Sequence, residues 1–461
     1  MNNMFVGLSS LESLDLSSFD TSNVTNMGSM FSDCSSLTEL DLSGFDLREG
    51  NSFTSIAGGI FGGTSSLKKL NLSNMKLPAD MSHAIFRFGS ANSSPIEEID
   101  VTGWDLSNTT NANGMLGANG SNGLGGTGLK RIIGLDTWDT SKVTNMSYMF
   151  QGLSSLTTLD LSNFDTSNVT NMEAMFYGCS GLTEINVTNF DTSNVTNMPA
   201  MFLNCNSLTD IDVSNFDTSN ATNIASMFSG CSSLTELDLS GFDLRAVNSF
   251  GSIAGSIFSG TSSLKKLNLS NMKLPADMSH AIFRSGQLSS SPIEEIDVTG
   301  WDLSNTTNAY GMFAASGSNG LGGTGLKRII GLDTWDTSHI TDMSQMFQGL
   351  SSLTTLDLSS FNTSNVTRMD AMFLYCSSLT QLDLSNFNTS NVTNVSSMFN
   401  NCISLTTLDL SSFNTSNVTN TDDMFNGCTS VTTAYGRTNT DITKLNASRN
   451  KPSNINFVLK S

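Results

Sequence analysis

The chain has 461 residues and a formal charge of −20, although only 13% of its residues are charged. An acidic protein of this kind repels phosphate, which excludes nucleic acid binding as its main activity. The chain contains no apolar run approaching about 18 residues and no basic segment followed by an apolar one at its N-terminus, so we expect neither membrane insertion nor a signal peptide within it.

A repeat of 26 residues starts near the N-terminus and continues through most of the chain. Its most regular markers are phenylalanines that directly follow a methionine: Phe5 and Phe31; Phe150, Phe176, Phe202 and Phe228; Phe347, Phe373, Phe399 and Phe425. Looser units between these runs have their markers at Phe61, Phe86, Leu116, Phe258, Phe283 and Phe313. The sequence therefore predicts about sixteen units between residue 5 and residue 450 or so.

Each unit is expected to form one short strand and one short helix. In the unit that starts at Phe150, residues 156–161 have the pattern L-x-x-L-x-L, whose last two leucines alternate as in a strand. Apolar side chains then recur at the spacing of a helix about two turns long: Met172, Met175, Phe176 and Cys179. The predicted fold is a repeat solenoid of the leucine-rich-repeat type, with one parallel β-strand and one helix per unit.

The chain also contains a longer repeat, which spans several of the short units. Residues 64–87 are identical to residues 261–284, and residues 120–141 are identical to residues 317–338, both at an offset of 197. We therefore expect a solenoid over residues 1–435, made of two super-repeats at about 1–197 and 198–394 plus closing repeats. Residues 436–461 lose the pattern and are predicted to form a C-terminal cap and an exit strand. The Gly-rich segments 117–128 and 317–325 are predicted to be flexible loops.

Pairs of like charges occupy the two variable positions of successive strands in the looser units. The pairs are Lys68 and Lys69, Glu97 and Glu98, Lys130 and Arg131 in the first copy, and Lys265 and Lys266, Glu294 and Glu295, Lys327 and Arg328 in the second. Stacking of the units places basic over acidic over basic residues. Two interpretations stay open: a salt-bridge ladder that fixes the register of the repeats, and a patch that recognises a partner. These residues are our candidate interaction surface.

In other units the same two positions hold threonine, as at residues 157–158, 354–355 and 406–407. A flat threonine-rich face is a candidate for binding glycans or ice. Threonine is also simply a favourable strand residue, and both interpretations stay open.

Two series of aspartates recur at fixed positions of the repeat. The first consists of Asp15, Asp41, Asp160, Asp212, Asp238, Asp357, Asp383 and Asp409, and the second of Asp20, Asp46, Asp165, Asp191, Asp217 and Asp243. Stacked carboxylates are a candidate calcium site. However, asparagine replaces aspartate at Asn71, Asn186 and Asn268 in the first series and at Asn362, Asn388 and Asn414 in the second. Because asparagine keeps the hydrogen-bonding shape without the charge, the pattern favours capping of the backbone turn.

All seven cysteines lie three residues after a marker phenylalanine, at a position where other units have leucine. Stacked equivalents have parallel Cβ vectors, which suits disulfide geometry badly, so we expect buried free thiols. The sequence has only three histidines, His83, His280 and His339, and no nucleophile, paired-acid or phosphate-loop arrangement stands apart from the repeat. It predicts no catalytic residues, no metal ligands and no cofactor.

The phrase M-F-x-x-C-x-x-L-T-x-L-D-L-S-x-F-D-T-S-N-V-T-N-M recurs with small changes, as at residues 175–198. It resembles the BspA-like leucine-rich repeats of bacterial surface proteins, and the closing residues 446–460 resemble the end of such arrays in lactobacillus-type Gram-positive proteins. This resemblance implies a secreted or cell-wall-attached adhesin of the bacterial cell surface. Its secretion and anchoring signals are then expected outside this chain.

The hypothesis from the sequence is a non-enzymatic adhesion or protein-interaction module. Its expected partners are host extracellular matrix proteins, mucins, cell-surface proteins or glycans, and self-association stays open. One alternative is a structural spacer or stalk that displays other domains. Another is a glycan- or calcium-dependent binder.

Overall fold

The computed structural model describes residues 1–48, 60–77, 81, 95–117, 128–247, 257–274, 293–314 and 325–460. These residues fall into two compact units, Met1–Leu234 and Thr235–Ser461. The markers Phe86 and Phe283, the histidines His83 and His280, and nearly all of both Gly-rich segments lie outside the described residues. The total number of coils therefore stays a prediction, as do the predicted boundaries of the super-repeats and the cap.

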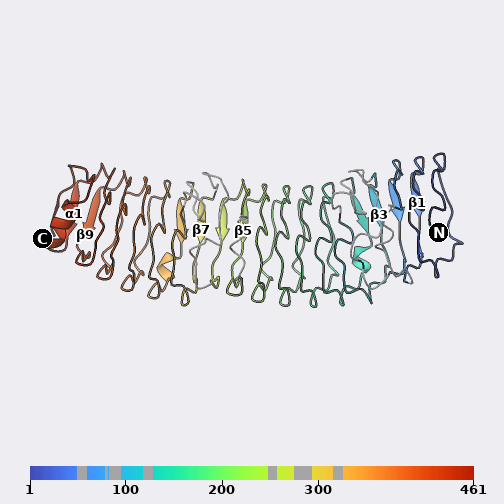
Figure 1. Cartoon of the computed structure of the whole chain (residues 1–461), viewed down its shortest axis with the longest axis horizontal. Coiled ribbons are helices and arrows are strands. Elements are labelled where there is room, and N and C mark those ends of the chain that lie inside the picture. Colours follow the sequence, from blue (N-terminus) through green and yellow to red (C-terminus); the bar gives the residue numbers. More distant parts are fainter. Residues whose placement is uncertain are drawn as a thin grey trace. The chain divides into compact units, whose positions relative to one another are not determined.

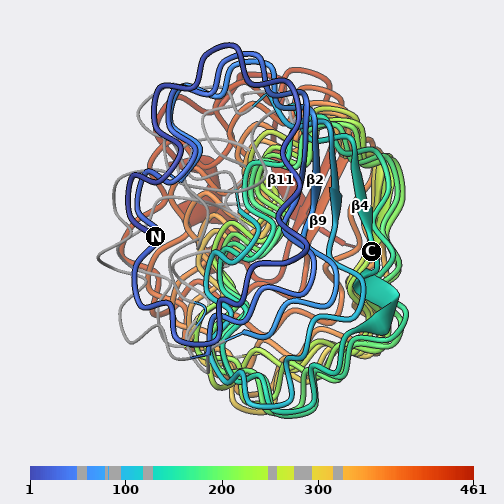
Figure 2. The same cartoon turned by 90° about the vertical axis from the view of Figure 1, so that its right-hand side faces the viewer.

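Successive coils of unit 1 stack so that their short strands form a parallel sheet (Figure 1). The strands are β1 (Glu39–Asp41), β2 (Lys69–Asn71), β3 (Glu98–Asp100) and β4 (Arg131–Ile133), in that order in the sheet. Their central residues Leu40, Leu70, Ile99 and Ile132 are directly paired. Seen along the stack, β2 and β4 lie on the same side of the coils (Figure 2). The one-turn helix η2 (Leu135–Thr137) follows β4.

Unit 2 repeats this arrangement with β5 (Glu236–Asp238), β6 (Lys266–Asn268), β7 (Glu295–Asp297), β8 (Arg328–Ile330) and η3 (Leu332–Thr334). Its last sheet has the order β11-β10-β9 and is parallel throughout. These strands are β9 (Thr407–Leu410), β10 (Thr433–Gly436) and β11 (Phe457–Leu459), and helix α1 (Asn439–Asn446) lies between β10 and β11 in the chain. The predicted solenoid with parallel strands is confirmed.

Helix α1 is fixed to the preceding coil by buried polar contacts. The carboxylate of Asp441 accepts hydrogen bonds from the backbone N–H and the hydroxyl of Thr415 at 2.8 and 2.7 Å. The Lys444 ammonium donates to the carbonyls of Thr415 and Val418. Burial alone would raise the pKa of Asp441, but the hydrogen bonds from Thr438 and Thr415 outweigh it and lower that pKa to about 2.

The helix predicted for each unit is wrong in the units that the structure describes. In the segment after Met172, Ala174 has φ +52° and Gly178 has φ +74°, values that break a right-handed helix. Alternate N–H groups donate to the next coil instead of to residue i−4: that of Ala174 to Pro199 and that of Phe176 to Met201, both at 2.9 Å. The intervening groups close turns three residues back, as from Tyr177 to Ala174. Consecutive turns bury the same i, i+3, i+4, i+7 positions as a helix, which explains the misleading spacing.

The interior of the stack is a column of equivalent side chains from successive coils. Phe176, Phe202 and Phe228 are fully buried, and their rings stack at centroid distances of 5.4 and 5.5 Å. All seven cysteines are buried free thiols, as predicted. The Cys179 thiol donates to the Phe150 carbonyl of the preceding coil at 3.1 Å, and burial raises its pKa to about 12. The most repetitive residues of the sequence therefore form the core.

None of the helices in the described part of the chain has the length and apolar character needed to cross a membrane.

Candidate interaction surface

Strands β1–β3 bury their central residue, and the side chains on both sides of it are exposed or half-buried. Leu40 and Leu70 are 3% and 2% exposed. Their neighbours Glu39 and Lys69 are exposed, because successive residues of a strand point to opposite faces. We call the outward side chains of residues 38–41, 68–71, 97–100 and 130–133 the ladder face. Residues 235–238, 265–268, 294–297 and 327–330 form its copy in unit 2.

The outer row of the ladder face is a three-membered ion-pair chain. Glu97 accepts from the Lys68 ammonium at 2.8 Å on one side and from the Lys130 ammonium at 2.9 Å on the other. These two hydrogen bonds lower the pKa of Glu97 to about 2. The predicted order of basic over acidic over basic residues is confirmed for this row.

The next row, which we call the middle row, contains two separate ion pairs. The Lys69 ammonium lies 3.1 Å from the Glu39 carboxylate, and the Arg131 guanidinium lies 3.3 Å from the Glu98 carboxylate. The hydrogen bond to Glu39 raises the pKa of Lys69. Both basic side chains are more than half exposed, so these pairs contribute little to stability.

The copy in unit 2 repeats three of these four ion pairs. Lys327 pairs with Glu294 at 2.8 Å and Arg328 with Glu295 at 3.4 Å. Lys266 pairs with Glu236 at 2.8 Å, which raises the pKa of Lys266. The hydrogen bond from Lys327 lowers the pKa of Glu294, and the charge of Lys265 adds to this effect. The structure thus brings the predicted charged residues together within each unit. A role in binding a partner stays a prediction.

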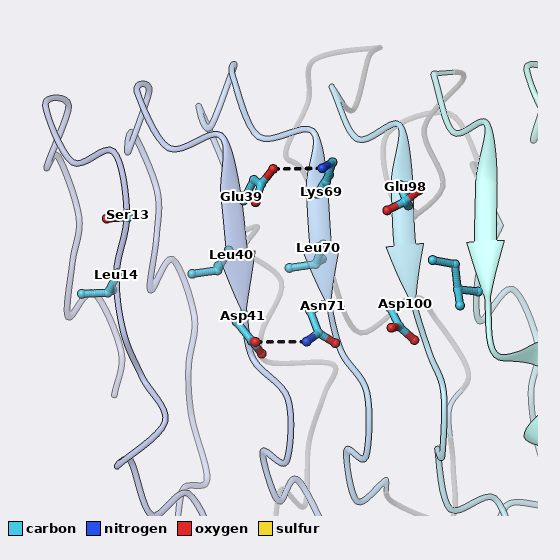
Figure 3. A pocket seen from close by; sticks show the side chains of 11 residues that line it. Ser13, Leu14, Glu39, Leu40, Asp41, Lys69, Leu70, Asn71, Glu98 and Asp100 are labelled. Carbon is cyan, nitrogen blue, oxygen red and sulfur yellow. Dashed lines mark hydrogen bonds and ion pairs between the residues drawn. The ribbon is translucent and has the colours of Figure 1, made fainter.

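The ladder face of unit 1 holds an open hollow of about 400 Å³ (Figure 3). Its polar lining comprises Ser13, Glu39, Asp41, Lys69, Asn71, Glu98 and Asp100. Inside it, the Asn71 amide donates to the Asp41 carboxylate at 3.0 Å. Glu39 was not among the residues predicted for this surface. The available signal was an acidic residue at the same strand position, one unit before each lysine pair, as at Glu39 and Glu236.

The aspartate series cap backbone turns, as predicted. Asp160 accepts the N–H of Ser162 at 3.0 Å, and Asp165 accepts that of Ser167 at 2.9 Å. The asparagine at position 186 does the same with Thr188 at 3.1 Å. Within the described ranges, no group of three or more His, Cys, Asp or Glu side chains is placed to hold a metal ion.

A second charged cluster was missed in the sequence. At the repeat position of the second aspartate series, the unit after Asp46 has Lys76 instead. The Lys76 ammonium lies 3.6 Å from the Asp46 carboxylate, and Arg48 pairs with the same carboxylate at 2.6 Å. The hydrogen bond from Arg48 is the main cause of the low pKa of Asp46, about 2. Its copy joins Asp243 to Arg245 and Lys273. The sequence signal for this cluster was the presence of a lysine at a repeat position where other units have aspartate.

Three solved structures similar to the chain are bacterial. A leucine-rich repeat protein from Bacteroides ovatus is 14% identical, with 83% of this chain and 81% of that one covered and a TM-score of 0.40. One from Eubacterium ventriosum is 16% identical, with 78% and 82% covered and a TM-score of 0.30. A leucine-rich cell surface protein from Faecalibacterium prausnitzii is 14% identical, with 90% and 83% covered and a TM-score of 0.25.

None of the curated proteins compared with the chain matches it. One family model matches it repeatedly, at residues 1–94, 79–184, 126–235, 180–294 and 324–438. These matches include the ladder face of unit 1 and most of the regular coils, and they leave out residues 295–323 of unit 2. The chain therefore belongs to the family described as "Mycoplasma protein of unknown function, DUF285".

Proposed function

We propose that the chain is a non-enzymatic interaction module of the bacterial cell surface. It binds host matrix proteins, mucins or cell-surface ligands through the outward strand face of its coils. Many weak contacts repeated along the stack add up to a useful avidity when the coils engage one ligand together.

The observation that carries this proposal is the exposed, charged face of β1–β4 and of its copy. Lys68, Lys130 and Arg131 are 62–67% exposed although each is paired with a glutamate. Such exposed pairs contribute little to folding, so stability alone does not account for these rows of charge. Charged side chains presented in fixed register favour specific recognition of a complementary surface.

The test is binding of the purified chain to immobilised fibronectin, laminin, collagen and mucin, measured by biolayer interferometry. The matched variant carries Lys68→Gln, Lys69→Gln, Glu97→Gln, Glu98→Gln, Lys130→Gln and Arg131→Gln, with the same changes in the second copy. We expect binding by the unchanged chain and its loss in this variant. Failure of the unchanged chain to bind any of these ligands contradicts the proposal.

A structural spacer is the second candidate, and side-chain bonds between coils favour it. The Asn168 amide donates to the Ser141 carbonyl of the preceding coil at 2.8 Å, and Asn194 and Asn220 repeat this contact one and two coils later. Such ladders stiffen a stack without providing a binding site. Absence of ligand binding, together with normal display of attached domains, favours the spacer. Calcium dependence is tested by thermal melting with and without a chelator.

A further inference from the structure

We propose that the ladder face of β1–β4 pairs with the same face of a second copy of this chain, with the order of the coils reversed. This inference rests on the proposed function as an interaction module and adds a second kind of partner for the same face. Three rows of side chains carry it: the row of Thr38 and Lys68, the row of Glu39 and Lys69, and the row of Asp41 and Asn71.

The middle row alternates strictly in charge. From β1 to β4 it reads Glu39, Lys69, Glu98 and Arg131, which is minus, plus, minus, plus. A two-fold axis parallel to the strands, between β2 and β3, reverses this order in the second copy. Glu39 then faces Arg131 of the second copy, and Lys69 faces Glu98 of the second copy. Each charge in the row meets its opposite.

The outer row is compatible with the same axis. It reads Thr38, Lys68, Glu97 and Lys130 from β1 to β4. After reversal, Lys68 faces Glu97 of the second copy, and Lys130 faces the uncharged Thr38. Both pairs of facing side chains avoid like charges.

The inner row also avoids like charges when the same axis is applied. It reads Asp41, Asn71, Asp100 and Ile133. Reversal places Asp100 opposite Asn71 of the second copy and Asp41 opposite Ile133. Pairing with the coils in the same order instead places Glu39 on Glu39 and Lys69 on Lys69, and like charges brought together cost several kcal/mol. The charge pattern therefore selects one orientation.

The ladder face is dense in charges of both signs. The chain carries −20 from 21 basic and 41 acidic residues. The ladder face has four basic residues (Lys68, Lys69, Lys130, Arg131) and five acidic ones (Glu39, Asp41, Glu97, Glu98, Asp100), which gives −1. The face therefore combines many charges of both signs with a small net charge, so opposite charges are available to meet across a contact. The copy in unit 2 has the same composition, so each chain offers two such faces.

The contact is small, so the pairing is weak. Four strands spaced by about 4.8 Å, each about 12 Å long, present on the order of 250 Å². Stable complexes bury about 800 Å² per partner. Pairing is therefore expected between surfaces that display many copies, where avidity raises the effective affinity.

The experiment measures the clumping of beads coated with the full chain. We expect clumping at about 20 mM salt and dispersal at about 1 M salt, where charges are screened within about 3 Å. One variant makes the middle row acidic through Lys69→Glu, Arg131→Glu, Lys266→Glu and Arg328→Glu. The other makes it basic through Glu39→Lys, Glu98→Lys, Glu236→Lys and Glu295→Lys. Neither variant is expected to clump alone, whereas a mixture of the two is expected to clump.

A second pair of variants separates the ladder face from overall charge. Lys69→Gln, Arg131→Gln, Lys266→Gln and Arg328→Gln lower the net charge by four and are expected to abolish clumping. The control set, Thr157→Glu, Thr158→Glu, Thr354→Glu and Thr355→Glu, lowers it equally at exposed positions of the regular coils outside the ladder faces and is expected to clump like the unchanged chain. Thermal melting verifies that each variant is folded.

Three results overturn the inference: dispersed wild-type beads at low salt, clumping of the acidic or basic variant alone, or no clumping of their mixture. Binding to matrix proteins and mucins is measured separately. Its outcome distinguishes failure of self-pairing from failure of the proposed function.

Discussion

The laddered coils of β1–β4 and the regular coils of residues 150–231 share one core but present different outer faces. Phe31 in the first region and Phe202 in the second are both buried and stacked between equivalent phenylalanines. The outer strand positions hold paired charges in the first region and residues such as Thr157 and Thr183 in the second. The Thr183 N–H still donates to the Thr157 carbonyl at 3.2 Å, although the regular coils form no continuous ladder.

This difference teaches that the core and the outer face of a coil are specified separately. Side chains that point inward determine stacking, while those that point outward are free to vary because they contact mainly solvent and their equivalents one coil away. Changes to the core should therefore affect both regions alike, and changes to the charged rows should affect only the laddered coils.

The largest expected effect is the loss of a stacked phenylalanine. Phe202→Ala and Phe31→Ala each remove a buried ring and leave a cavity, which lowers the free energy of unfolding by about 3–5 kcal/mol. Urea denaturation measures this loss. The exposed Tyr375, changed to alanine, is the control and should leave stability nearly unchanged. A large loss in only one of the two regions contradicts the common core.

The next effect distinguishes the observed turns from the predicted helix. Ala200 has φ +56°, a left-handed conformation in which glycine is favoured over alanine by about 1 kcal/mol. Ala200→Gly is therefore expected to raise the free energy of unfolding. In a helix the same change would lower it by about 1 kcal/mol. Ala225→Gly serves as the control at a nearby position, where we expect a loss of stability. A decrease for Ala200→Gly argues for the helix.

A smaller effect comes from the ion-pair chain, and it is confined to the laddered coils. Glu97→Gln removes the pairs with Lys68 and Lys130. We expect a melting temperature lower by a few degrees at low salt and unchanged at about 1 M salt. Thr183→Ala in the regular coils should show no dependence on salt. Equal salt dependence of both variants would remove the distinction between the regions.

The smallest effect is the acid dependence of the same glutamate. Its folded-state pKa is lowered to about 2 from the usual 4.5. Its contribution to stability is therefore fully present above pH 4.5 and is lost as the pH falls from 4.5 towards 2. Over this pH range, the melting temperature of Glu97→Gln should therefore change less with pH than that of the unchanged chain. A steeper pH dependence of the melting temperature in the variant would contradict the lowered pKa of Glu97.

Much of the core and of the charged face follows from the repeat alone. The spacing of Phe176 and Cys179 identifies a buried side of the coil, and the structure confirms both as core residues. The offset of one unit between Lys68 and Glu97 correctly predicts that they stack. A period of fixed length makes residues one unit apart neighbours in space, so a sequence pattern becomes a pattern of contacts.

Other features could not be read from the sequence. Helical spacing at Met172 and Met175 arises from turns, because turns and helices bury the same positions. The contribution of Glu39 and Asp41 to the hollow depends on how neighbouring strands expose their flanking side chains. The contact of Lys76 with Asp46 involves a lysine that was not singled out from the sequence.

The sequence by itself determined that the chain stacks its repeats, which side chains form the interior, and that charged pairs alternate in sign from one strand to the next. Only the tertiary structure decided that each Met-Phe segment is a series of turns and which individual atoms of the charged pairs bond to each other. The physical reason is that the deciding hydrogen bonds run between coils. Ala174 bonds to Pro199, and Lys130 reaches back to Glu97, so their partners are set by stacking and not by local preference.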